Sequence, residues 1–193
     1  MNKLSEKHIG ILCGGWSDER LISLDSGKSA HKSLIDNNLN SFLFDFKDND
    51  INMLSNFIES NSIDIVLNLI HGSGGEDGIV QNYLDRLSIK YVGSNSEASK
   101  LSFNKVRTKE VWLKNGLNTP NYLKLSDNIS SKKIEEMFGQ KFILKPCESG
   151  SSVGIKIFDT ANFYSSSSLE ILEKLSLSSI ESSDYFIEEF ITA

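Results

Sequence analysis

The sequence predicts an α/β protein in which helices flank a parallel sheet. His8–Cys13 is a short apolar run that passes through Gly14-Gly15 into a stretch of helical character at about 21–36. Strand, glycine turn and helix in this order open a doubly wound α/β unit, whose ligands gather at the carboxyl ends of the strands. Residues 63–70, IDIVLNLI, are rich in branched apolar side chains, as are the buried strands of a parallel sheet.

The other elements of the first hundred residues follow from two periodicities. Alternating phenylalanines predict a strand, and apolar residues three and four positions apart predict a helix. The expected elements are a strand at 41–46, a helix at 52–61, a helix at 79–87 that Asp77 caps, and a strand at 89–92. Together with the first and third strands, these segments predict a sheet of four strands by about residue 93.

A second part of the chain begins near Ser94. Gly116 follows a helical stretch and is suited to stop it, because glycine readily takes the left-handed conformation after a helix. The expected elements are helices at 104–115, 130–138 and 162–175, and strands at 122–125, 142–144, 155–158 and 185–191. This second part therefore also mixes helices and strands.

Composition and charge narrow the class of protein. The 193 residues carry a formal net charge of −6 and the sequence pI is near 5.1, which argues against a nucleic-acid binder. Residues 1–10 lack the apolar segment of a signal peptide, and no apolar run approaches the roughly 20 residues that span a bilayer. Two cysteines are too few to indicate a disulfide framework. We therefore expect a soluble, cytoplasmic protein that binds neither nucleic acid nor membrane.

The stretch 142–154, FILKPCESGSSVG, joins a buried strand to a loop of small residues. Lys145 stands at the end of the apolar run, and Pro146 ends the strand because proline has no N–H to donate. Glycine and serine then let backbone N–H groups and hydroxyls turn toward an anion. Lys105, in the first turn of an expected helix, suits a phosphate at the free N–H groups of that helix. These residues indicate a phosphate site, although a β-hairpin with a polar loop explains the stretch 142–154 as well.

Polar residues also follow two strands of the first part. Glu19 and Arg20 carry opposite charges at the sheet edge where ligands gather, so they can take both ends of a zwitterion. A solvated helix start explains the same pair, since the helix dipole favours an acid there. His71 begins the loop HGSGGEDG, whose four glycines, histidine and two acids make a poor structural loop. A binding or catalytic role is therefore favoured for His71.

Five segments carry a resemblance to a known family. They are, in order, GGWSDERLIS, HGSGGEDG, NKVRTK, ILKPCESGSSVG and, more weakly, YFIEEF. With these motifs the chain resembles the D-alanine–D-alanine ligases, ATP-grasp enzymes of peptidoglycan synthesis. The resemblance implies a Rossmann-like N-terminal substrate domain at residues 1–100 and the first α+β lobe of an ATP-grasp fold at 101–193. It also implies that ATP turns one D-alanine carboxylate into an acyl phosphate, which the amine of a second D-alanine attacks.

The resemblance implies roles for individual residues. Glu19 would orient the ammonium of the first D-alanine, and His71 would lie by its carboxylate. Lys105 and Lys145 would hold ATP phosphates, and Glu188 would accept from the adenine amino group. The other implied nucleotide contacts are the closing loop Ser151, Ser152, Val153 and Gly154, and the base contacts Glu189, Phe190 and Ile191. Ser151 would also tie this loop to Glu19, and these two residues form the implied catalytic pair.

The chain departs from the family pattern at a few positions and in length. Asn104 stands where aspartate is usual and Leu21 where glutamate is common, and Cys147 and Ser149 alter the loop. The family's second ATP-grasp lobe, which would supply the Mg²⁺ carboxylates, is not found in these 193 residues, so no metal ligand is expected in them. We therefore expect an incomplete ligase that is inactive by itself.

Two alternatives and a partner remain open on the sequence. The chain can be a non-catalytic remnant that binds nucleotide or amino acid, or part of a ligase that uses D-lactate or D-serine as its second substrate. The resemblance also implies a homodimer through the N-terminal domain.

Overall fold

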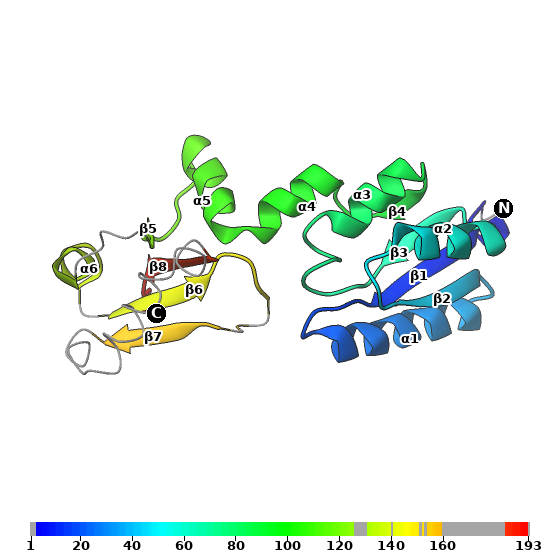
Figure 1. The fold of residues 1–193 in the computed structure, drawn as a ribbon, viewed down its shortest axis with the longest axis horizontal. Coiled ribbons are helices and arrows are strands. Elements are labelled where there is room, and N and C mark those ends of the chain that lie inside the picture. Colours follow the sequence, from blue (N-terminus) through cyan, green and yellow to red (C-terminus); the bar gives the residue numbers. More distant parts are fainter. Residues whose placement is uncertain are drawn as a thin grey trace. The chain divides into compact units, whose positions relative to one another are not determined.

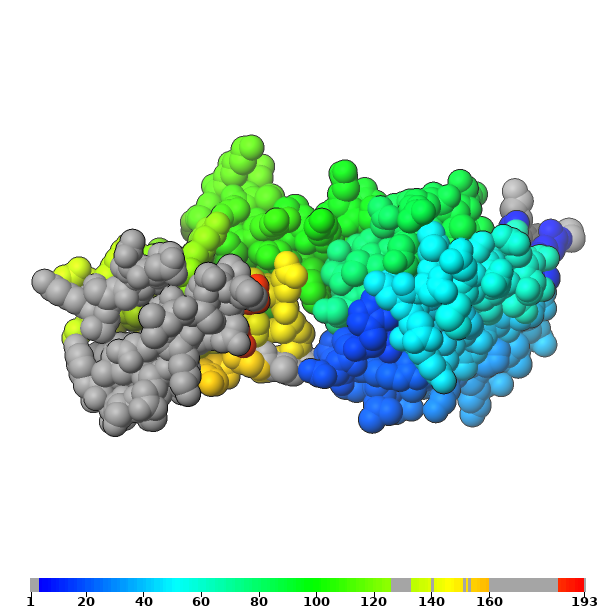
Figure 2. Space-filling model, in the orientation of Figure 1, coloured from blue at the N-terminus to red at the C-terminus, as the bar shows by residue number. Residues whose placement is uncertain are grey.

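The computed structural model describes residues 3–125, 131–139, 141–150, 152, 154–159 and 184–192. The chain divides into two compact units, Met1–Ser102 and Phe103–Ala193, called here the first and second units (Figure 1). In Figure 2 the blue-to-green residues of the first unit pack into a continuous body. No helix in the described part of the chain is both long and apolar enough to cross a membrane.

The first unit is built on a parallel sheet of four strands in the order β2-β1-β3-β4. The strands are β1 (His8–Gly14), β2 (Asn40–Phe46), β3 (Ile65–Asn68) and β4 (Lys90–Val92). The helices are η1 (Lys3–Glu6), α1 (Arg20–Asp36), α2 (Ile51–Ser60), α3 (Ile79–Arg86) and α4 (Ser96–Phe103). Ile9 pairs with Ser41 of β2 and with Ile65 of β3, so β1 lies inside the sheet. The predicted α/β class with a parallel sheet is confirmed.

Helices cover both faces of this sheet (Figure 1). On one face Gly27 of α1 lies against Cys13 of β1. Leu12 is the next residue along β1 and therefore points to the other face, where α2 and α3 pack. The core on that face contains Leu12, Phe46, Leu54, Ile58, Ile63, Val66, Ile70, Val80 and Leu84. Burial on both faces explains why the third strand is a continuous apolar run in the sequence.

The second unit contains an antiparallel sheet in the order β5-β8-β6-β7. The strands are β5 (Tyr122–Lys124), β6 (Lys141–Pro146), β7 (Lys156–Asp159) and β8 (Tyr185–Glu189), and the helices are α5 (Lys105–Lys114) and α6 (Ser131–Phe138). Phe142 and Phe158 stack with their ring centroids 5.2 Å apart, at the centre of a core that includes Leu144 and Ile187. The strand expected at 155–158 is confirmed as β7, which pairs with β6. The strand β6 ends at Pro146, as expected.

One helix of the structure is not expected from the sequence, and one expected helix lies outside the described residues. The helix α4 was not predicted, because its sequence SEASKLSF has little apolar periodicity and buries one residue, Ser99. Its side chains give a weak signal, so the helix cannot be recognised from the pattern. The helix expected at 162–175 lies outside the described residues.

Candidate functional sites in the two units

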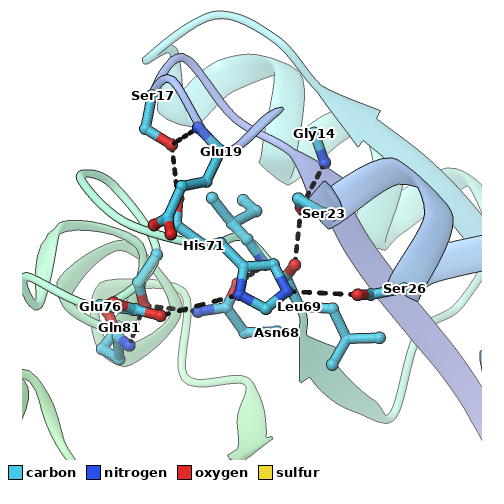
Figure 3. A network of polar contacts seen from close by, with 12 residues as sticks. Gly14, Ser17, Glu19, Ser23, Ser26, Asn68, Leu69, His71, Glu76 and Gln81 are labelled. Carbon is cyan, nitrogen blue, oxygen red and sulfur yellow. Dashed lines mark hydrogen bonds and ion pairs between the residues drawn. The ribbon is translucent and has the colours of Figure 1, made fainter. Parts of the chain in front are cut away.

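The first site lies at the carboxyl edge of the parallel sheet. The strands β1 and β3 are neighbours, so the loops that follow them meet there. Ser17 donates from its Oγ to the backbone oxygen of His71 at 2.7 Å. Ser23 of α1 donates from its Oγ to Leu69 O at 2.6 Å and accepts from Gly14 N at 2.8 Å (Figure 3). Two serines thus join the loop after β1 to the loop after β3.

Glu19 and His71 belong to this polar cluster (Figure 3). A Cβ atom on Gly72 would lie 2.9 Å from Glu19 Oε2, so the absence of a side chain at Gly72 leaves room for the carboxylate. His71 Nε2 lies 3.3 Å from Ser26 Oγ, and His71 Nδ1 lies 3.8 Å from Glu76 Oε1. Two carboxylates and an imidazole therefore face one small region, and the carboxylates suit the ammonium of a small amino acid.

Arg20 does not serve the zwitterion role that its sequence position indicated. Its guanidinium donates to both carboxylate oxygens of Asp45 at 2.8 Å and to Gly15 O at 3.0 Å. A two-point ion pair of this kind holds the arginine in a fixed orientation. Arg20 therefore ties the glycine turn after β1 to the end of β2, and the ligand-binding part of the interpretation rests on Glu19.

The loop HGSGGEDG is held from both ends by side chains. Asp77 accepts from Ile79 N at 3.0 Å and from Gly74 N at 2.7 Å. The N-cap residue of α3 is Gly78, so Asp77 binds the first N–H of the helix from the position before the cap and is not the N-cap itself. The backbone oxygen of Gly75 accepts from Asn68 Nδ2 at 2.9 Å and from Gln81 Nε2 at 2.6 Å. These bonds fix the loop that carries His71, and they connect it to β3 and α3.

The second site lies at the start of α5, in the second unit. The backbone N–H of Lys105 donates to Cys147 O at 2.9 Å, and its Nζ donates to Ser149 O at 2.7 Å. Asn104 caps the helix by accepting from Arg107 N at 3.0 Å, and it also donates to Glu148 Oε1 at 2.8 Å. The asparagine that departs from the family pattern thus joins α5 to the loop after β6.

The charge of Lys105 is influenced by its surroundings. Burial lowers the pKa of the Lys105 ammonium below its ordinary value, and the positive charge of Lys145 lowers it further, against the opposing effects of Cys147 and Glu148. Two lysines from separate elements, α5 and β6, are therefore close enough to repel each other. Such a pair is suited to hold an anion, since a phosphate between them removes the repulsion.

Lys145 is paired with Glu188 of β8, and a second lysine that the sequence reading did not select shares this carboxylate. Lys145 Nζ contacts Glu188 Oε2, and Lys109 Nζ contacts Glu188 Oε1. Lys109 lies in NKVRTK, one turn after Lys105, but a lysine in a helix ordinarily indicates a solvated face. Only its burial identifies it, because its exposed fraction is 5%.

The remaining predicted nucleotide contacts lie in the loop after β6 and around the end of β8. Ser152 and Gly154 both have positive φ, +60° and +75°, while Ser151 and Val153 lie outside the described residues. Glu189 accepts from Asn121 N at 3.3 Å and from Asn121 Nδ2 at 3.0 Å. Phe190 is half-buried, with its ring centroid 5.8 Å from Lys141 Nζ, and Ile191 is exposed. The roles of all these residues stay predictions.

Among the described residues, no group of three or more histidine, cysteine, aspartate and glutamate side chains is arranged to hold a metal ion. Mg²⁺ prefers an octahedral set of oxygen ligands. The described side chains therefore include no such group of candidate ligands for a metal ion.

The Cys147 thiol is expected to react slowly with alkylating reagents. Burial raises its pKa to about 11, with further contributions from Asp184 and Glu148. The thiolate is the reactive form, so a shift from 9.0 to about 11 lowers its population at pH 7.5 roughly 100-fold. Iodoacetamide labelling of a Cys13→Ala variant, followed by mass spectrometry, should be slow at pH 7.5 and should accelerate up to about pH 11. The neutral thiol also contributes stability that is present below pH 9 and lost between pH 9 and 11. Rapid labelling of the folded chain at pH 7.5 would contradict the burial of this loop.

Known proteins resemble the chain over both units. Residues 45–94 match a family model described as the N-terminus of D-ala D-ala ligase. The D-alanine–D-alanine ligase B of Xanthomonas campestris pv. campestris is 39% identical over 159 residues, which are 79% of this chain and 49% of that protein. The chain thus spans about half the length of the curated relatives it matches.

Solved structures give the same result. The D-alanine–D-alanine ligase from Bacillus anthracis superimposes with a TM-score of 0.74 at 28% identity, covering 97% of this chain and 58% of that one. A structure of the same organism's ligase complexed with ATP superimposes with a TM-score of 0.73 at 25% identity, covering 97% of this chain and 60% of that one. The sequence matches, the family model and the fold agree that the chain is similar to the N-terminal portion of the D-alanine–D-alanine ligases.

Proposed function

We propose that this chain supplies the first D-alanine site and the phosphate-binding lysines of an ATP-dependent D-alanine–D-alanine ligase for peptidoglycan synthesis. The observation that carries the proposal is the proximity of two lysines from separate elements, Lys105 of α5, which donates to the loop after β6, and Lys145 of β6. The first unit would be the Rossmann-like substrate domain, and the second would be the first ATP-grasp lobe. Both substrates are cytoplasmic metabolites, so we place the activity in the cytoplasm.

The reaction would proceed in two steps. A carboxylate oxygen of the first D-alanine attacks the γ-phosphorus of ATP, and the bond from that phosphorus to the β-phosphate bridging oxygen breaks, which gives an acyl phosphate and ADP. The amine of the second D-alanine then attacks the acyl carbon, loses a proton and displaces inorganic phosphate. Phosphoryl transfer depends mainly on positioning and charge neutralisation, so lysines and backbone amides suffice as the contribution of this chain.

Individual residues would have the following roles. Glu19 would hold the ammonium of the first D-alanine, and His71 would lie by its carboxylate. Lys105 and Lys145 would bind ATP phosphates, and Glu188 would accept from the adenine amino group. The loop of Ser151, Ser152, Val153 and Gly154 would close over the phosphates, with Ser151 linked to Glu19, while Glu189, Phe190 and Ile191 would border the base. Closure would keep water from the acyl phosphate. A homodimer through the first unit belongs to the same proposal.

The test exchanges one charge in each site. In a chimera, residues 1–193 replace the matching part of the Xanthomonas campestris ligase, and steady-state kinetics are measured for each substrate. Glu19→Gln should weaken use of the first D-alanine by roughly 10- to 150-fold, because a charge-assisted hydrogen bond of about 1.5–3 kcal/mol is lost, and it should leave the KM for ATP nearly unchanged. Lys145→Ala should do the opposite, raising the KM for ATP and slowing phosphoryl transfer.

The outcomes separate the candidate functions. Equal losses for both substrates in Glu19→Gln would contradict the role given to Glu19, and normal ATP kinetics in Lys145→Ala would contradict the phosphate site. A chimera that binds ATP but makes no dipeptide would favour a non-catalytic binding chain. A chimera that joins D-alanine only to D-lactate or D-serine would assign a different second substrate.

A further inference from the structure

Three charged side chains of the second unit form a buried cluster, called here the triad: Lys109, Glu188 and Lys145. Each oxygen of the Glu188 carboxylate contacts one lysine ammonium, Oε1 that of Lys109 and Oε2 that of Lys145. Glu188 and Lys109 are 6% and 5% exposed, whereas the Lys145 side chain is 23% exposed. The triad therefore has a buried end at Lys109 and an open end at Lys145.

The ammonium of Lys109 has no capacity left for a ligand. A lysine has three N–H donors. Besides contacting Glu188, Lys109 Nζ donates to Thr119 Oγ1 at 2.6 Å and to Pro120 O at 3.1 Å, and it lies 5.3 Å from the centre of the Tyr122 ring. Saturated and buried, Lys109 can act on a nucleotide only through Glu188 and Lys145.

The net charge of the triad depends on Lys109. A carboxylate paired with Lys145 alone would cancel the positive charge of that lysine and would repel a phosphate. With Lys109 included, two ammonium groups and one carboxylate leave a net charge of +1. In a region of low dielectric this difference is large, because an uncompensated charge there is poorly screened. A carboxylate also has about four lone-pair sites, so holding two lysines leaves Glu188 able to accept from another donor.

We propose that Lys109 is a positioning residue for ATP: it holds Glu188 so that Glu188 orients the Lys145 ammonium without cancelling its attraction for phosphate. The inference rests on the proposed role of Lys145 as a phosphate ligand and extends it to a residue that does not contact the nucleotide. It predicts that loss of the buried Lys109 ammonium lowers the affinity for ATP. It also predicts that removing the Glu188 charge in the same variant restores the affinity.

The experiment measures ATP affinity of the 193-residue chain by isothermal titration calorimetry, with thermal unfolding of each variant as a check of folding. Lys109→Met should weaken ATP binding by roughly 10-fold, since the triad becomes neutral. Lys109→Arg should restore most of the affinity. Lys109→Met combined with Glu188→Gln should also recover affinity, because Lys145 then keeps its charge and the introduced amide oxygen can still accept from the adenine amino group. Lys124→Met is the matched control, since Lys124 pairs with Glu110 at the surface of the same unit and its loss changes the net charge equally.

A second measurement does not need ATP. The Hε–Cε signal of Lys145 in lysine-labelled protein, assigned with Lys145→Arg, should shift in Lys109→Met and return in Lys109→Arg. An affinity in Lys109→Met equal to that of Lys124→Met, or a double variant no better than Lys109→Met, would overturn the charge compensation. An unchanged Lys145 signal would overturn the positioning role. If the wild-type chain binds no ATP, the proposed phosphate site is contradicted, and the Lys145 signal alone decides whether Lys109 positions Lys145.

Discussion

Replacement of Gly75 by alanine is expected to lower the free energy of unfolding of the first unit by about 3 kcal/mol or more. The Cβ atom of the alanine would lie 1.9 Å from the backbone oxygen of Ile70, a distance at which the backbone itself must move. The φ of Gly75 is not in the left-handed region, so the cost is steric. The backbone oxygen of Gly75 also accepts from Asn68 and Gln81, and displacement weakens both bonds.

The same displacement should reach the candidate D-alanine site. Ile70 directly precedes His71, so a shift of the Ile70 carbonyl moves the imidazole away from Ser26 and Glu76. We therefore expect Gly75→Ala to weaken D-alanine binding as well as to lower the stability of the first unit. The weaker binding should be seen at urea concentrations where the variant is still folded.

Urea denaturation of a Trp112→Phe background would measure the effect on the first unit. The remaining Trp16 reports this loop, because its ring lies beside Gly74 and edge-on to Phe46 at 5.9 Å. Gly10→Ala is the control: a Cβ there would lie 3.0 Å from a side-chain atom of Ile63, which can adjust, so a loss of about 1 kcal/mol is expected. Equal losses in Gly75→Ala and Gly10→Ala would mean that the loop is not held as described.

Much of the fold follows from local patterns in the sequence. The parallel strands of the first unit are read from apolar runs and alternating phenylalanines, and the glycine turn after Cys13 marks where the first helix begins. The meeting of the Glu19 and His71 loops follows only if β1 and β3 are neighbours. The sequence indicates that both are strands, whereas their adjacency comes from the sheet order.

The sequence does not predict which distant residues form ion pairs or hydrogen bonds with one another. Arg20 looks available for a ligand until Asp45, 25 residues later, is found beside it. Lys109 looks like a solvated helix residue until β8 brings Glu188 against it from 79 positions away (188 − 109). A local pattern contains no information about such long-range ion pairs, which depend on how the strands and helices pack. The departure at Asn104 has a similar explanation, since its second partner, Glu148, comes from another element.

Glu188→Gln is expected to lower the free energy of unfolding of the second unit by about 3–5 kcal/mol. The two side chains have nearly the same shape, so no cavity forms and the loss is electrostatic. Lys109, 5% exposed, then has only neutral oxygens as hydrogen-bond acceptors, those of Thr119, Pro120 and the introduced amide, and a buried charge without a counter-ion is costly. Lys145 is more exposed and can turn toward water, so most of the loss arises at Lys109.

The measurement is urea denaturation followed by the fluorescence of Trp112, which lies on α5 with Lys109, in a Trp16→Phe background. Glu189→Gln provides the matched control on the same strand. Its carboxylate accepts from the N–H groups of Asn121, and an amide oxygen can accept from those donors too, so a change of about 1 kcal/mol or less is expected. Because the Lys109–Glu188 pair is buried, 1 M NaCl should leave most of the difference between the two variants in place. A difference that vanishes in salt, or equal stabilities of the two variants, would show that the Glu188 carboxylate is solvated and that it does not hold Lys109.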